Sequence, residues 1–147
     1  MSKKIIFIDL DGTLIDKGNR NVIKSTIEAL EKAKENGHRI VLSTGRPPVL
    51  FHGIDKHLDI NSYISCNGHY VVYDGKVIYS NPINNEYITE LVKFSKQEKI
   101  DLSMQNDSEF ILESEYDTLY KKFSDNFNMQ YPILNSGYYK LMDVYQI

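Results

Sequence analysis

The chain has 147 residues, of which 41% are hydrophobic and 25% charged, and its formal net charge at pH 7 is −3. This length and composition predict a soluble globular protein with a sizeable core, and they are not typical of a disordered chain. The sequence has no apolar run near the ~20 residues of a membrane span and no basic stripe that would indicate a nucleic-acid partner. Its single cysteine, Cys66, cannot form an internal disulfide, which favours a cytoplasmic location.

The first predicted element is a short strand over residues 5–8, Ile-Ile-Phe-Ile. Four apolar residues in a row suit a strand of a parallel sheet that is buried on both faces. Two carboxylates follow at once, Asp9 and Asp11, and then Gly12 and Thr13. Ligands of open α/β sheets bind beyond the carboxyl ends of strands, so these acids are expected where chemistry would take place. An ordinary polar turn at Asp11-Gly12 is the alternative.

A βαβ unit is predicted next. Apolar residues recur at helical spacing from about Val22 to Asn36, and Gly37 stands where such a helix would end. A second apolar strand follows at residues 39–42. Strand, helix and strand within about 40 residues predict two parallel strands joined by a crossover. The two strands should therefore end at the same edge of the sheet.

The second strand opens into a polar turn, Ser43-Thr44-Gly45-Arg46-Pro47. Parallel pairing places Thr44 on the sheet edge that carries Asp9. Its hydroxyl and the neighbouring N–H groups could hold a phosphate oxygen, with Ser43 as the competing choice, and Arg46 could add positive charge. The alternative is that the hydroxyl caps the start of a helix.

Further elements complete the first half of the chain. A short helix is predicted from Pro48 to about Leu58 and a third strand over residues 62–65, ending in Cys66-Asn67-Gly68. Asn-Gly is itself a hairpin signal. A two-residue hairpin around Asp74-Gly75 is predicted to join strands at 70–73 and 76–79.

Residues 81–147 are predicted to form a separate, smaller α+β unit, while residues 1–80 form the α/β unit. The predicted order is a helix, two strands, a helix and a final strand, at about 85–99, 101–105, 110–113, 116–127 and 139–144. The four histidines show no metal-ligand spacing with Cys66.

The string Asp9-Leu10-Asp11-Gly12-Thr13 resembles the Asp-x-Asp-Gly-Thr motif of the haloacid dehalogenase-like (HAD) phosphohydrolases. Ser43 to Pro47 looks like the second motif of that family, and residues 63–68 resemble the strand-end Asn-Gly of its Cof-type branch, cap class IIB. The resemblance implies a Rossmann-like parallel sheet at 1–80, the N-terminal part of a HAD core. It also implies an incomplete α+β cap domain at 81–147.

The same resemblance implies Mg²⁺-dependent hydrolysis of small phosphorylated metabolites, such as sugar phosphates, through an aspartyl phosphate. Asp9 would be the nucleophile, and Asp11 would protonate the leaving oxygen and then activate water. Mg²⁺ would bind the Asp9 carboxylate and the Asp11 carbonyl oxygen. The remaining residues that the resemblance assigns are Gly12, Thr13, Thr44 and Gly45 for the phosphate, with Arg46 and Asn67 near the substrate.

Two motifs of the family have no counterpart in this sequence: the lysine third motif and the acidic fourth motif, usually Gly-Asp-x-x-Asn-Asp. Asn106-Asp107 lacks the preceding Gly-Asp and is rejected as a substitute. We therefore expect a chain that is truncated within the cap, with weak Mg²⁺ affinity and little phosphatase activity alone. The first strand should form an apolar sheet edge that is open to self-association or to a C-terminal half.

Two alternatives belong to other functional classes. The chain could be a non-catalytic module that binds phosphate or a partner through the exposed sheet edge. It could also be a phospho-accepting receiver domain, but such a domain expects its acceptor on a later strand and a downstream lysine. The Asp-Gly-Thr string argues against that reading.

Overall fold

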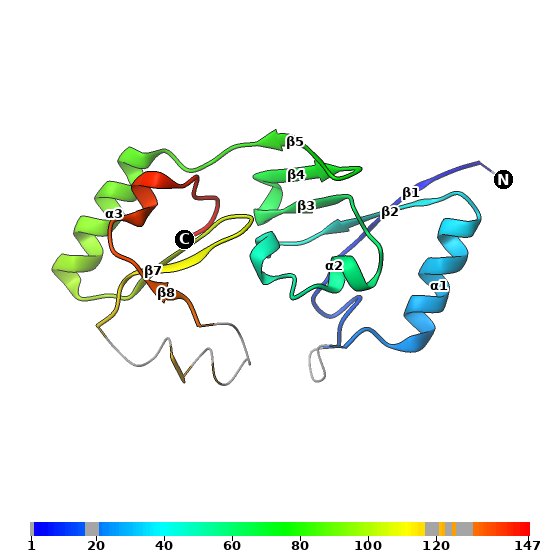
Figure 1. Ribbon diagram of the computed structural model, residues 1–147, viewed down its shortest axis with the longest axis horizontal. Helices are drawn as coiled ribbons and strands as arrows, with labels where there is room; N and C mark the ends of the chain where they lie inside the picture. Colours follow the sequence, from blue (N-terminus) through cyan, green and yellow to red (C-terminus); the bar gives the residue numbers. More distant parts are fainter. Residues whose placement is uncertain (1, 17–20, 117–120, 123–124, 126–130) are drawn as a thin grey trace. The chain divides into compact units, whose positions relative to one another are not determined.

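The computed structural model describes residues 2–16, 21–116, 121–122, 125 and 131–147. The chain folds as two compact units (Figure 1). Unit 1 comprises Met1–Arg46 and Phe51–Ser80, and unit 2 comprises Pro47–Leu50 and Asn81–Ile147. Within the described part of the chain, no helix has the length and hydrophobicity needed to cross a membrane.

Unit 1 is built on a five-stranded sheet in the order β1-β2-β3-β4-β5. The strands β1 (Ile5–Ile8), β2 (Arg39–Ser43) and β3 (Tyr63–Ser65) run parallel to one another. The antiparallel strands β4 (Tyr70–Tyr73) and β5 (Lys76–Ser80) extend the sheet beyond β3. The predicted α/β class and parallel strands are confirmed, and the added hairpin makes the sheet a mixed one.

Strand β1 lies at one edge of this sheet. Ile6 and Ile8 pack against the core, whereas Ile5 and Phe7 on the opposite face are 53% and 58% exposed. The prediction that this strand is buried on both faces is wrong. The reason is that the described elements cover only one face of β1, so alternate side chains point to solvent.

The core of unit 1 joins helix α1 (Lys24–Glu35) to the covered face of the sheet. Leu30 of α1 clusters with Leu42 of β2 and with Phe51, which lies beyond β2. The helix begins two residues after the predicted start. It ends at a C-cap, Asn36, followed by Gly37 at φ +79°, in the left-handed region that suits glycine after a helix.

The single helix predicted over residues 48–58 is wrong. The segment contains two short helices, η1 (Pro48–Leu50) and α2 (Ile54–His57). Between them His52 and Gly53 have φ values of +53° and +78°, which no right-handed helix accommodates. The break turns Phe51 into the core, where it is 2% exposed.

The predicted hairpin around Asp74-Gly75 is confirmed. Both residues have positive φ, +48° and +72°, as a two-residue turn with the twist of the flanking strands requires. The pairing of β4 with β5 contains a bulge, since Val71 faces Tyr79 and Val72 faces Val77. Ile78 is therefore the extra residue on β5.

Unit 2 consists of α3 (Asn85–Glu98) and a three-stranded sheet in the order β6-β7-β8. Its strands are β6 (Leu102–Gln105), β7 (Phe110–Ser114) and the short β8 (Ile133–Leu134), which pairs parallel to β7. Apolar side chains of α3, among them Ile88, form a core with the sheet. The sequence did not predict β8, whose two residues are too short a pattern.

The final strand predicted over residues 139–144 is also wrong. Gly137, at φ +84°, leads instead into the 3-10 helix η3 (Tyr138–Leu141). Tyr139 and Val144 do enter the core of unit 2, so the apolar pattern reflects burial without strand pairing. The helix predicted over residues 116–127 lies for the most part outside the described residues.

Candidate functional site

The loops that follow β1, β2 and β3 meet at the carboxyl-terminal end of these parallel strands in unit 1. This follows from parallel pairing, because Ile8 lies beside Leu42 and the chain leaves both strands in the same direction. Contacts between the loops confirm it. The N–H of Cys66, after β3, donates to the carbonyl oxygen of Arg46, after β2, at 3.2 Å. Arg46 in turn binds Asp11, after β1.

The loop after β1 presents Asp9 to solvent. One of its carboxylate oxygens, Oδ1, accepts the N–H of Leu10 at 2.8 Å. Gly12 has φ +80°, which a glycine adopts without strain, and its N–H donates to the carbonyl oxygen of Ile15 at 2.9 Å. The N–H of Gly12 is thus used within the loop, and a phosphate would have to displace Ile15 to receive it. Thr13 is exposed in the same turn.

Asp11 and Arg46 form a two-pronged ion pair. Arg46 Nε donates to Asp11 Oδ2 at 2.8 Å, and one terminal nitrogen donates to Oδ1 at 2.5 Å. Both oxygens of the Asp11 carboxylate are therefore occupied by one guanidinium, the geometry in which such pairs are strongest. The prediction placed Arg46 near a substrate and missed this contact. Opposite charges in the two loops of a βαβ unit were the available signal.

Thr44 is 7% exposed at the end of β2. Its N–H donates to the carbonyl oxygen of Ile64 at 3.0 Å, and its Oγ1 accepts the N–H of Arg46 at 3.1 Å. This second bond closes a local turn of the kind that hydroxyl side chains favour. Accepting it leaves the hydroxyl's own proton as a donor for an anion. Ser43, the competing choice, is the last residue of β2.

Gly45 and Asn67 are packed against each other. A Cβ atom added at Gly45 would lie 2.9 Å from Asn67 Oδ1, closer than real Cβ contacts. Asn67 sits in the left-handed region at φ +54°, a conformation that asparagine tolerates better than most residues. The structure therefore brings Asn67 to the same loop cluster as Asp11, Thr44 and Arg46.

The oxygen atoms that these strand-end loops present are partly suited to binding Mg²⁺. Among the described residues, no group of three or more His, Cys, Asp or Glu side chains could hold a metal ion. One carboxylate, Asp9, and the backbone carbonyl oxygens nearby are hard oxygen ligands, whereas the Asp11 carboxylate is engaged by Arg46. Mg²⁺ commonly binds through one or two carboxylates and keeps several waters. The site therefore fits a weakly held Mg²⁺ and not a protein-enclosed metal.

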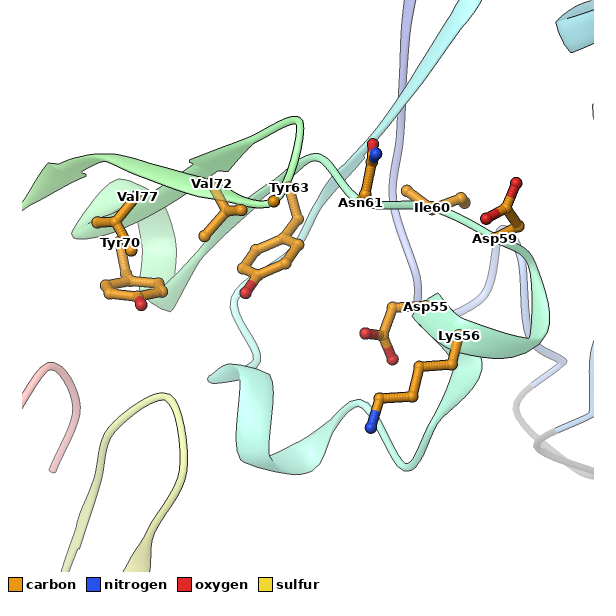
Figure 2. A pocket seen from close by; sticks show the side chains of 10 residues that line it. Asp55, Lys56, Asp59, Ile60, Asn61, Tyr63, Tyr70, Val72 and Val77 are labelled. Atoms are coloured by element: carbon orange, nitrogen blue, oxygen red, sulfur yellow. The ribbon is translucent and has the colours of Figure 1, made fainter.

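A separate groove of about 500 Å³ lies elsewhere in unit 1 (Figure 2). Its side chains come from α2, the segment before β3, and the strands β3 to β5. Figure 2 shows the rings of Tyr63 and Tyr70 on the same side of the strands as Asp55 of α2. None of its lining residues belongs to the three strand-end loops, so it is not part of the candidate site.

A family model described as haloacid dehalogenase-like hydrolase matches residues 6–147. Among named proteins, the chain is 31% identical over 116 residues to the pyridoxal phosphate phosphatase YbhA of Escherichia coli. That alignment covers 77% of this chain and 42% of YbhA. The chain thus spans less than half the length of this relative.

Solved structures share the fold, and two of them match nearly the whole of this chain. A Geobacillus kaustophilus protein, 30% identical, superposes with a TM-score of 0.92 and covers 99% of this chain. The HAD subclass IIB sugar phosphatase BT4131, 27% identical, superposes with a TM-score of 0.77 over 97% of this chain. In each case the match spans 56% of the solved chain. The predicted resemblance, including its subclass, is confirmed.

Proposed function

The chain belongs to the haloacid dehalogenase-like hydrolase family, and on that premise we propose that it carries part of a Mg²⁺-dependent phosphatase site. The reaction is the hydrolysis of small phosphorylated metabolites through an aspartyl phosphate. Asp9 is the nucleophile, and Asp11 is the acid and base. The residues that hold phosphate and contact substrate come from the loops after β1, β2 and β3.

One observation carries this proposal: the loops bearing Asp9, Asp11, Thr44 and Asn67 are joined at the carboxyl-terminal end of the parallel strands. The bonds from Arg46 to Asp11 and from Cys66 to Arg46 link them. An anion at this end of the strands would meet the exposed carboxylate of Asp9, the buried hydroxyl of Thr44 and the guanidinium of Arg46. That combination suits a phosphoryl group more than a neutral ligand.

The first step forms a bond between an Asp9 carboxylate oxygen and phosphorus as the bond from phosphorus to the leaving oxygen breaks. Asp11, which takes up a proton from water once Arg46 has left its carboxylate, gives that proton to the leaving oxygen, so an alcohol departs. Thr44 donates its hydroxyl proton to a phosphate oxygen and holds the group in place. The product is an acyl phosphate on Asp9.

The second step reverses the role of Asp11. Its carboxylate takes a proton from water, whose oxygen attacks phosphorus, and the bond to Asp9 breaks to release inorganic phosphate. Both aspartates then stand in their starting forms. The Asp9 carboxylate and the Asp11 carbonyl oxygen would hold Mg²⁺, which when bound would offset the repulsion between the anionic nucleophile and the phosphate.

Arg46 has a place in this scheme beyond proximity to the substrate. Both Asp11 oxygens accept bonds from its guanidinium, so Asp11 reaches a leaving oxygen only after at least one of them opens. A phosphate dianion offers the same guanidinium a competing two-pronged partner. We expect substrate binding to draw Arg46 from Asp11 to the phosphate and so release the acid.

The substrate class is proposed as sugar phosphates and similar small phosphomonoesters. The supporting names are those of relatives, a sugar phosphatase and a pyridoxal phosphate phosphatase. These 147 residues contain no counterpart of the lysine and acidic motifs of the family. We therefore propose that the 147-residue chain by itself is impaired, with weak Mg²⁺ binding. A cytoplasmic location is proposed from its one cysteine.

The test combines binding with turnover on the full 147-residue chain. Calorimetric titration with inorganic phosphate should detect binding that needs Mg²⁺ and is lost in Asp9→Asn. Hydrolysis of p-nitrophenyl phosphate should be close to background. If that hydrolysis is instead robust, Mg²⁺-dependent and abolished by Asp9→Asn, the chemistry stands and the impairment is refuted.

A second arm separates a phosphatase site from a non-catalytic module. The C-terminal half of a relative, which carries the two absent motifs, is added in trans. Activity that appears with it and depends on Asp9 supports the phosphatase. Phosphate binding that survives in Asp9→Asn, with no activity under either condition, supports a binding module.

A further inference from the structure

The groove of about 500 Å³ in unit 1 combines an apolar floor with two opposite charges (Figure 2). All of its lining residues lie between Asp55 and Val77 in the chain, on α2, the segment that follows it and the strands β3 to β5. The sheet order places these strands toward the end that is remote from β1 and its loop. We propose that the groove binds a free α-amino acid with an apolar or aromatic side chain.

Four side chains form the floor of the groove because of the strand register. Tyr63 pairs with Val72, and Val72 pairs with Val77, so these three side chains lie on one face of the sheet. Tyr70 is two residues before Val72 on β4 and shares that face. An aromatic and aliphatic surface of this kind suits the hydrocarbon part of a small ligand.

Asp55 and Lys56 of α2 supply the two opposite charges. The side chain of Asp55 is half-buried and that of Lys56 is exposed. Among the described residues, neither side chain has a hydrogen-bond or ion-pair partner. Successive residues of a helix do not face each other, which keeps these two charges from pairing. One carboxylate and one ammonium are therefore available to a ligand.

The remaining charge at the groove already has a partner. Lys34 Nζ lies 3.5 Å from Asp59 Oδ2, and it donates to the carbonyl oxygens of Leu58 and Asp59 at 2.6 Å each. The charges that a ligand meets are thus those of Asp55 and Lys56, and their sum is zero.

The walls of the groove are held in place before a ligand binds. The ring of Tyr63 packs edge-on against Phe51, with 5.2 Å between the ring centroids. The N–H of Gly75, in the hairpin turn, donates to the carbonyl oxygen of Asn61 at 2.8 Å and ties the hairpin to the segment before β3. Lys34 holds the end of α2 through the bonds described above. A preformed site of this kind loses little free energy to ordering when it binds.

A zwitterion fits this arrangement better than a simple ion. An anion bound to Lys56 would be repelled by Asp55, and a cation bound to Asp55 would be repelled by Lys56. The ammonium and carboxylate of an α-amino acid satisfy both charges at once. Its side chain would then lie on the floor. The volume of the groove falls within the range of about 300–1,000 Å³ that is typical of small-molecule sites.

A titration of the full 147-residue chain followed by ¹H–¹⁵N NMR tests the proposal, with L-phenylalanine as the probe. We expect a dissociation constant of about 1 mM, with amide shifts concentrated on α2 and on β3 to β5. Three matched compounds each lack one part of the probe: 2-phenylethylamine lacks the carboxylate, 3-phenylpropanoate the ammonium and glycine the side chain. Each should bind at least about threefold more weakly.

Two charge variants assign the contacts. Asp55→Asn should weaken the binding of L-phenylalanine about threefold or more without weakening that of 3-phenylpropanoate. Lys56→Met should weaken L-phenylalanine similarly without weakening 2-phenylethylamine. Asp16→Asn and Lys76→Met, at exposed positions outside the groove, are the matched controls and should bind as the parent does.

A third variant tests the floor. Val77 is 52% exposed, so Val77→Ser should fold, as far-UV circular dichroism checks, and should weaken L-phenylalanine about threefold. Ile78→Ser is the matched control, because Ile78 is also exposed but does not line the groove. If Val77→Ser does not fold, the two charge variants still decide the question. Asp9→Asn should leave this binding unchanged, which separates it from the proposed phosphatase site.

Several outcomes would overturn the proposal. The first is the absence of amide shifts at about 10 mM L-phenylalanine, ten times the expected dissociation constant. The second is 2-phenylethylamine or 3-phenylpropanoate binding as tightly as L-phenylalanine. The third is binding that Asp55→Asn and Lys56→Met both leave unchanged, or that the control variants weaken equally.

Discussion

The guanidinium of Arg46 donates hydrogen bonds to both carboxylate oxygens of Asp11 and so joins the loop after β2 to the loop after β1. The pair lies 35 residues apart in sequence and is bidentate, which fixes the relative orientation of the two loops. Asp11 remains half exposed, so water and salt screen the attraction. The pair therefore acts more as a positioning device than as a large source of stability.

A double-mutant cycle tests this reading. Arg46→Ala and Asp11→Ala should show a coupling free energy of about 0.5–1 kcal/mol in urea unfolding, falling as salt is added. Arg39→Ala is the matched control, because Arg39 pairs with Asp74 and not with Asp11. Combined with Asp11→Ala it should be additive. If the coupling free energy between Arg46 and Asp11 is no larger than that between Arg39 and Asp11, the pairing is contradicted.

Mg²⁺ affinity should depend unequally on the two aspartates. Asp9→Asn should weaken Mg²⁺ binding at least about tenfold, since it removes the one carboxylate of the proposed ligand set. Asp11→Asn should weaken it only a few-fold, because the backbone carbonyl oxygen is unchanged and the carboxylate is held by Arg46. Calorimetry measures both, with Asp16→Asn as an exposed control. The reverse order would refute the proposed ligands.

Gly45→Ala should disturb the site through one neighbour. Gly45 has no positive φ, so the added methyl group acts by its contact with Asn67 Oδ1 alone. We expect a destabilisation of about 1 kcal/mol and weaker phosphate binding. Adding Asn67→Gly removes the obstructing side chain at a left-handed position that glycine accepts. If this second change fails to restore stability, the steric account is wrong.

Glu113 is a buried carboxylate of unit 2, 2% exposed. It accepts bonds from Ser136 Oγ at 2.9 Å and from the N–H of Gly137 at 2.5 Å, and Lys96 Nζ lies 3.2 Å away. Glu113→Ala leaves these donors without their acceptor and should cost about 3 kcal/mol. Chemical unfolding measures the loss. Glu90→Ala, at an exposed position of α3, should cost less than about 0.5 kcal/mol.

Tyr138 should titrate late. Its phenol O–H donates to Glu109 Oε1 at 2.7 Å. That bond, and the negative charge of Glu109, raise the pKa of Tyr138 above its ordinary value. Because the pKa is higher in the folded state, the contribution to stability is present below about pH 10 and is lost as the pH rises through the raised pKa.

Alkaline difference absorbance checks this. The titration of the folded chain minus that of Tyr138→Phe should isolate a phenol with a raised midpoint. Glu109→Gln should move that midpoint back toward the ordinary value. A midpoint that Glu109→Gln leaves unchanged would contradict the assignment of its cause.

Much of the framework follows from local sequence pattern. The βαβ unit, the Asp74-Gly75 hairpin and the helix at 85–98 each depend on residues close together in the chain: apolar spacing, a capping asparagine or glycine, and turn residues that accept positive φ. Asn84, for example, caps α3 by accepting the N–H of Glu86. The likeness to the HAD family rests on similarly short strings.

Tertiary structure decided what depends on distant neighbours. An apolar run such as Ile5–Ile8 predicts a strand but does not show whether one face or both faces of it are covered. The arrangement of the other elements decides this, and it leaves Phe7 exposed. The break at His52-Gly53 and the 3-10 turn after Gly137 each direct side chains into a core. The other residues of these cores are distant in sequence, so a local sequence pattern does not predict the contacts. The partner of Asp11 was likewise set by packing, since a carboxylate binds the nearest well-oriented cation, wherever that cation stands in the sequence.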